Sequence, residues 1–137
     1  KVLGNVVPFT GNSSLNFEKI SPEEVVISLK NIRSVQNHIK QVHACAMALV
    51  IETATGFVVG MNVPDDKILL IKEMNLKYVK RSSGKVIATA SLTQVQIDEI
   101  KNEPKGDIAV PVILTDDEGK EPVKAEAIWA WREKKGN

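Results

Sequence analysis

Apolar and polar residues alternate over several short stretches of the chain, and such a period of two predicts half-buried β-strands. Gly, Ser, Pro and Asp residues separate these stretches and indicate turns. The segments Ser82-Ser83-Gly84 and Asp116-Asp117-Glu118-Gly119 predict hairpin turns between the strands that flank them, and Pro111 indicates an edge strand or a bulge. The predicted strands are 15–20, 25–29, 68–80, 86–92, 108–114 and 123–131.

One long segment departs from this alternation. Residues 41–64 contain a single charged side chain, Glu52, within a run of small and apolar residues. A segment that is apolar nearly all round predicts a helix enclosed by the fold, which ends at Gly60 or Asn62 before Pro64. A membrane span is disfavoured because a carboxylate near its centre is costly in lipid. A second, short helix is expected at 94–102.

These elements predict one α+β domain over residues 1–137, in which an antiparallel sheet of about five or six strands wraps around the long helix. A Pro- and Gly-containing lead-in is expected at 5–12 and a solvated tail at 134–137. Trp129 and Trp131 share one face of the last strand and are expected in the core or at an interface.

Composition excludes several classes of function. The 18 basic and 17 acidic residues leave a formal charge of +1, which gives no field that favours nucleic acid or an anionic membrane. Aromatic residues make up 4% of the chain, too few for a single-stranded nucleic-acid platform. The single cysteine, Cys45, excludes an intrachain disulfide and a cysteine-based zinc cluster. We expect a cytoplasmic protein with no metal and no membrane insertion.

Glu52 is the residue with the clearest chemical signal. An ionised carboxylate inside an apolar helix costs several kcal/mol unless it is paired, and burial raises its pKa. No Lys or Arg lies within a helical turn of it. Such an acid is neutral, paired with a distant segment, or exposed to a cavity where it acts, and the pattern alone leaves these alternatives open.

Three residues form a spaced set, Asn37, His43 and Glu52, in the pattern Asn-x5-His-x8-Glu. This set resembles the signature of hotdog-fold acyl-CoA thioesterases, in particular the phenylacetyl-CoA-type branch. In that family a loop Asn precedes a His-Gly-Gly opening, and an Asp or Glu follows nine residues after the His.

The resemblance covers nearly the whole chain. The sequence is similar to a bacterial hotdog group of unassigned function, which is placed beside those thioesterases. The resemblance runs from Val7-Pro8-Phe9 to Leu92 and includes Tyr78 and Gly84.

The resemblance implies hydrolysis of acyl thioesters of coenzyme A or of an acyl carrier. Glu52 would act as general base on water or as nucleophile, and the Ala44 backbone N–H would polarise the thioester carbonyl. Asn37 would hold the water or the carbonyl, and His43 would orient the loop. Here Ala44 and Cys45 replace the two glycines of the family pattern. We expect Cys45 to be a small core residue rather than a nucleophile.

Further implications concern coenzyme A and oligomeric state. Lys77, Lys80 and Arg81 are candidate contacts for the phosphates of coenzyme A, which would be part of the substrate rather than a cofactor. Lys80 stands at or near the place where some relatives carry a Ser or Thr on the strand after the helix. The resemblance also implies a homodimer or a dimer of dimers.

Two other functions remain as alternatives. The departures from the family pattern are compatible with a non-catalytic module that binds an acyl thioester or a fatty acid. The hydratase branch of the same fold is disfavoured because His38 occupies the position where those enzymes carry an Asp.

Overall fold

The computed structural model describes residues 15–134, and the predicted lead-in at 5–12 and the Val7-Pro8-Phe9 segment lie outside the described residues. Two helices, a 3-10 turn and seven strands make up this part of the chain. In chain order these elements are β1 (Leu15–Ile20), β2 (Glu24–Leu29), η1 (Arg33–Val35), α3 (Ala44–Gly60), β3 (Lys67–Tyr78), β4 (Val86–Ser91), α4 (Gln94–Asn102), β5 (Gly106–Val110), β6 (Val112–Thr115) and β7 (Val123–Glu133).

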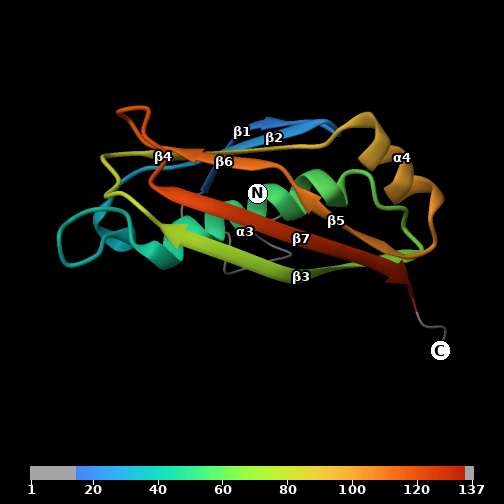
Figure 1. The fold of residues 1–137 in the computed structure, drawn as a ribbon. Helices are drawn as coiled ribbons and strands as arrows, with labels where there is room; N and C mark the ends of the chain where they lie inside the picture. Colours follow the sequence, from blue (N-terminus) through green and yellow to red (C-terminus); the bar gives the residue numbers. More distant parts are fainter. Residues whose placement is uncertain (1–14, 135–137) are drawn as a thin grey trace.

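The strands form two antiparallel sheets around one long helix. The first sheet has the order β1-β2-β4-β6 and the second has the order β3-β7-β5. Strands β5 and β6 follow one another directly, with only Pro111 between them, so this stretch pairs with β7 before the proline and with β4 after it. Helix α3 packs against strands of both sheets, and Figure 1 shows it running along their inner side. The predicted α+β fold, with a sheet wrapped around one helix, is confirmed.

Both predicted hairpins are wrong. At Asp116-Asp117-Glu118-Gly119 the chain turns between β6 and β7, which belong to different sheets. The same holds at Ser82-Ser83-Gly84. Strand β3 pairs with β7, whereas β4 pairs with β2 and β6, so the segment between β3 and β4 crosses from one sheet to the other. Gly84 lies within this crossing segment and has a φ of 71°, a left-handed backbone conformation that glycine adopts without strain. Alternation marked both strands correctly, but it carries no information on which strand each would pair with.

Helix α3 owes its position to its composition and its caps. Its buried side chains form one continuous core with β2, β4 and β7. Asn62 ends the helix, because its Nδ2 donates to the carbonyl oxygen of Val58 at 3.0 Å and to that of Pro22 at 2.9 Å. The helix begins at Ala44 after the N-cap residue His43, and these ends agree with the prediction.

Two tryptophans of β7 complete the core, as predicted. Trp129 and Trp131 are buried, and each ring lies where a glycine leaves space for it. A Cβ on Gly56 of α3 would lie 2.6 Å from the Trp129 ring, and one on Gly106 would lie 2.8 Å from the Trp131 ring. Both glycines therefore allow the helix and strand backbones to approach the rings closely.

Candidate functional site

Asn37 shapes the tip of the loop that leads into α3. Its Oδ1 accepts hydrogen bonds from the backbone N–H groups of Ile39 at 3.0 Å and Gln41 at 3.1 Å. Lys40, within this turn, adopts a φ of 62°, which is uncommon for a side chain with a Cβ. Because Oδ1 is engaged in this way, only the Nδ2 group of Asn37 remains to meet a substrate, and it can only donate.

His43 is the N-cap residue of α3. Its ring Nδ1 accepts a hydrogen bond from the backbone N–H of Cys45 at 3.0 Å. The backbone N–H of His43 donates to the carbonyl oxygen of Val35 at 2.8 Å. An Nδ1 acceptor places the ring proton on Nε2 in the neutral tautomer. His43 therefore fixes the start of the helix, in line with the orienting role that the resemblance implies.

The first N–H of the helix is left free by this arrangement. Within residues 15–134 the Ala44 N–H has no hydrogen-bond acceptor, whereas the Cys45 N–H is capped by His43. Free N–H groups at a helix N-terminus carry partial positive charge and favour developing negative charge nearby. Ala44 therefore has a backbone N–H that is available to an acceptor from outside the helix.

Tyr78, to which the sequence assigned no role in the site, contacts this turn from β3. Its hydroxyl donates to the Ala44 carbonyl oxygen at 3.0 Å, although the residue is 48% exposed. Partial burial, and then the nearby Cys45 thiol when ionised, raise the pKa of Tyr78 above its usual value of 10.0. The end of β3 and the start of α3 are thereby joined.

An open groove of about 230 Å³ lies beside this helix start. The η1 turn forms one wall and the first two turns of α3 form the other. Cys45 is exposed here and is therefore not the core residue that was predicted. The lining residues are Ser34, Val35, Gln36, His43, Cys45, Ala46 and Leu49, which combine apolar side chains with a polar rim.

Glu52 lies further along α3 and does not line this groove. The residue is half-buried in the single chain, so one copy of the protein does not enclose it fully. It shares a helix face with the exposed Cys45 and Gly60, and it forms no ion pair with another described residue. Glu52 follows Ala44 by eight positions, which is about 12 Å along a helix.

The three predicted cations take different places. Because Tyr78 points toward α3 and side chains alternate along a strand, Lys77 points to the opposite, outer face of the sheet, away from the helix start. Lys80 and Arg81 are exposed in the segment that follows β3. Lys80 therefore lies beyond the strand rather than on it, and cannot stand in for a strand Ser or Thr.

No helix among the described residues is long and apolar enough to cross a membrane. Over the same residues, no group of three or more His, Cys, Asp or Glu side chains is arranged to hold a metal ion.

Comparisons with known proteins bear on the whole chain. A family model described as "Domain of unknown function (DUF4442)" matches residues 1–131. The comparison with curated proteins gave no match.

Solved structures match over almost their full length. A Pseudomonas aeruginosa protein of unknown function, described as a "Probable Thioesterase", is 21% identical with a TM-score of 0.84, covering 96% of this chain and 91% of that one. A thioesterase from Haemophilus influenzae is 11% identical with a TM-score of 0.76, covering 96% and 88%. A thioesterase family protein from Silicibacter pomeroyi is 12% identical with a TM-score of 0.74, covering 97% and 95%. At these identities the likeness concerns the fold, and the predicted hotdog fold is confirmed.

Proposed function

The chain belongs to the family described as Domain of unknown function (DUF4442), and from its site we propose that it hydrolyses acyl thioesters of coenzyme A. The observation that carries this proposal is the first turn of α3, where the Ala44 N–H is free and the neighbouring Cys45 N–H is capped. The fold shared with thioesterases and the Asn37, His43 and Glu52 spacing support it. That spacing also favours the phenylacetyl-CoA-type branch.

The helix start would act on the thioester carbonyl. The Ala44 N–H and the free Nδ2 of Asn37 are both donors, and both would stabilise the negative charge that develops on the carbonyl oxygen. The apolar side chains of the neighbouring groove, Val35 and Leu49, would receive the acyl group.

Glu52 would supply the base. Its carboxylate would take a proton from water while the water oxygen bonds to the carbonyl carbon, after which the C–S bond breaks and the thiolate leaves with a proton. In the alternative route the carboxylate itself attacks the carbonyl carbon, expels the thiolate, and leaves a mixed anhydride that water then hydrolyses. Both routes release a free acid and a free thiol.

A single copy cannot complete this site. Reacting atoms must approach within about 3.5 Å, and the separation of about 12 Å along α3 places Glu52 too far from a carbonyl held at Ala44 of the same chain. A second copy related by a two-fold axis would bring its own Glu52 to this helix start. We therefore propose a homodimer, or a dimer of dimers, with two equivalent sites.

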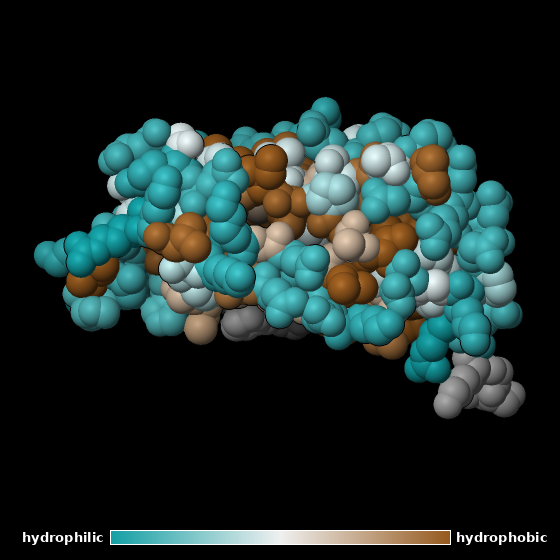
Figure 2. All heavy atoms as spheres, in the orientation of Figure 1, coloured by the Kyte–Doolittle hydropathy of each residue, from teal (hydrophilic) through white to brown (hydrophobic). Residues whose placement is uncertain are grey.

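The free edge of β3 is the surface we assign to this dimer. Among the strands of residues 15–134, β3 pairs only with β7, so no described strand covers its other edge along its twelve residues. Leu70 and Ile71 on this strand are exposed in the single chain. The three-stranded sheet faces the viewer in Figure 2. Hydrophobic side chains reach the surface across the middle of this face.

Thiol release from acyl-CoA tests the proposal. The wild-type protein should release free thiol from at least one member of a panel of short, long and aromatic acyl-CoAs. The variant Glu52→Gln keeps the shape of the side chain but cannot accept a proton, so kcat should fall by about 100- to 10,000-fold. Because Glu52 is half-buried, the variant should keep the wild-type circular dichroism spectrum and oligomeric state.

Glu99→Gln is the matched control, since Glu99 is an exposed glutamate on α4 that neither the mechanism nor the proposed dimer surface uses. It should keep wild-type turnover. Equal turnover in wild type and Glu52→Gln would exclude Glu52 as the base. Retention of acyl-CoA without thiol release across the panel would instead identify a binding module.

A further inference from the structure

Two segments far apart in the chain are bound together beside the proposed site. We name residues 79–85 the basic loop and residues 116–122 the acidic turn. The N–H groups of Val79 and Lys80 donate to the carbonyl oxygen of Pro122 at 2.8 and 3.2 Å, which attaches the start of the basic loop to the acidic turn.

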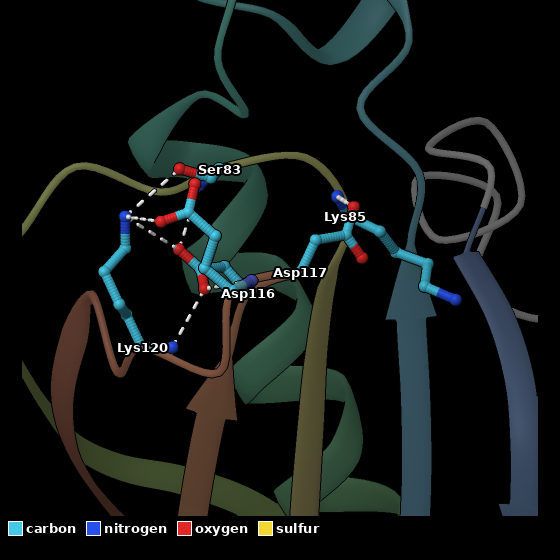
Figure 3. A network of polar contacts seen from close by, with 6 residues as sticks. Ser83, Lys85, Asp116, Asp117 and Lys120 are labelled. Carbon is cyan, nitrogen blue, oxygen red and sulfur yellow. Dashed lines mark hydrogen bonds and ion pairs between the residues drawn. The ribbon is translucent and has the colours of Figure 1, made fainter.

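Two aspartates hold the other end of the basic loop (Figure 3). The Ser83 N–H donates to Asp116 Oδ2 at 2.9 Å, and the Lys85 N–H donates to Asp117 Oδ2 at 2.9 Å. In return the Asp117 N–H donates to the Ser83 carbonyl oxygen at 3.0 Å. A Cβ on Gly84 would lie 2.1 Å from the Asp117 carboxylate, so the loop and the turn are in close contact.

Asp116 is the buried centre of this contact. Burial alone would raise its pKa, but hydrogen bonds from the backbone N–H groups of Lys120, Ser83 and Glu118, together with the charge of Lys120, hold the pKa below the usual 3.8. Lys120 Nζ also donates to Ser83 Oγ at 3.1 Å. Asp116 therefore stays charged, and keeps its hydrogen bond to the Ser83 N–H, throughout the neutral range.

The basic loop carries three cations, Lys80, Arg81 and Lys85, and the first two are the most exposed. Lys80 and Arg81 are exposed and form no ion pair with a described carboxylate. Lys80 follows Tyr78 by two residues, which is at most about 7 Å between Cα atoms. Since the Tyr78 hydroxyl contacts Ala44, the end of β3 that leads into the basic loop lies beside the start of α3.

We propose that the acidic turn is a positioning element for substrate: it holds the basic loop so that Lys80 and Arg81 meet the phosphates in the nucleotide half of coenzyme A. This inference rests on the proposed function for the identity of the ligand. A loop that is already ordered loses less conformational entropy when it binds, and for that reason the tethers raise affinity. Asp116 and Asp117 would act through the loop and would not touch the ligand.

Calorimetric titration with adenosine 3′,5′-bisphosphate tests the role of Asp117, because this probe carries the nucleotide phosphates and no thioester. Removal of a carboxylate beside an anion site should by electrostatics alone tighten binding. If Asp117 positions the basic loop, the reverse is expected. Asp117→Ala should weaken binding of the probe about fivefold or more, because the Lys85 N–H loses its acceptor. Asp117→Asn keeps an acceptor oxygen and should bind at least as tightly as wild type.

Asp98→Ala is the matched control, since it removes the same charge from the distant helix α4 and should leave binding unchanged. Unchanged or tighter binding by Asp117→Ala, or no binding by the wild type, would overturn the inference. Amide hydrogen exchange on the free wild-type protein needs no variant: the Ser83 and Lys85 amides should be protected, and unprotected amides would also overturn it.

The two proposals can fail separately. Weaker binding by Asp117→Ala in a protein that releases no thiol would refute the hydrolase function and keep the phosphate site. Thiol release that depends on Glu52, with unchanged probe binding by Asp117→Ala, would keep the hydrolase function and refute the positioning turn.

Discussion

Three polar side chains at the start of α3 bind backbone groups rather than one another. Asn37 accepts from the loop, His43 accepts from the Cys45 N–H, and Tyr78 donates to the Ala44 carbonyl. Each bond removes a competing partner or a degree of freedom from the turn that presents the Ala44 N–H. At the scale of single residues, these bonds hold the turn that presents the Ala44 N–H in one conformation, and they leave the Nδ2 of Asn37 available as a second donor.

Tyr78→Phe tests this preparation. The variant keeps the ring and loses one hydrogen bond, worth about 1 kcal/mol, which corresponds to about fivefold in rate if it is lost in the transition state. We expect kcat for the best acyl-CoA to fall by about that factor while KM stays within twofold. Steady-state kinetics measure both, and a rise in KM at unchanged kcat would show that Tyr78 serves binding instead.

At the scale of elements, two features hold α3 against β7: a buried hydrogen bond from Trp129 to Thr55, and a glycine, Gly56, that lets the helix approach the Trp129 ring. Trp129 Nε1 donates to Thr55 Oγ1 at 2.8 Å, and Thr55 Oγ1 donates to the Ile51 carbonyl at 2.8 Å. Gly56 leaves the space that the Trp129 ring occupies. The helix turn that carries Glu52 is thus placed relative to the sheet by these contacts.

Gly56→Ala should destabilise the protein although alanine is the better helix former. Its Cβ would lie 2.6 Å from a buried ring that is also hydrogen-bonded, so overpacking should cost about 1–3 kcal/mol. Gly60→Ala in the same helix is the control, because the nearest atom, on Leu69, would be 3.6 Å away. Urea unfolding should show a lower free energy of unfolding for Gly56→Ala alone, and equal values for the two variants would contradict the packing argument.

At the scale of the whole molecule, the proposed chemistry is divided between copies. The donors at the start of α3 and the carboxylate of Glu52 stand too far apart within one chain. The edge of β3 that no described strand pairs with offers a surface for a second copy. A symmetric dimer would satisfy both features at once, because a two-fold axis repeats the same contact and produces two sites.

Subunit complementation tests this division. Glu52→Gln and Asn37→Ala should each be inactive as homodimers. Co-expression with different affinity tags should produce hybrid dimers in which one of the two sites carries neither substitution. A random mixture should therefore recover up to about a quarter of wild-type activity. Absence of any recovery in purified hybrid dimers would place Glu52 and Asn37 in the same chain's site.

Much of the architecture follows from the order of residues alone. Period-two alternation located the strands, and the apolar run around Glu52 located the helix, because these patterns record which face of each element is buried. Helix α4 was equally visible, and its capping box, in which Thr93 and Gln96 cap each other, stabilises the predicted start. The Asn37, His43 and Glu52 spacing indicated the helix start as the region of interest.

Tertiary structure alone decided how these pieces meet. The pairing of β3 with β7 rather than β4, the contact of Tyr78 with Ala44, and the tethers of Asp116 and Asp117 to the basic loop all join residues more than thirty positions apart. The sequence also could not show that Glu52 is only half-buried in one copy, since burial depends on what covers a helix face. The local sequence pattern shows which side chains need to be buried. Which distant residues bury or bind them depends on how the whole chain packs.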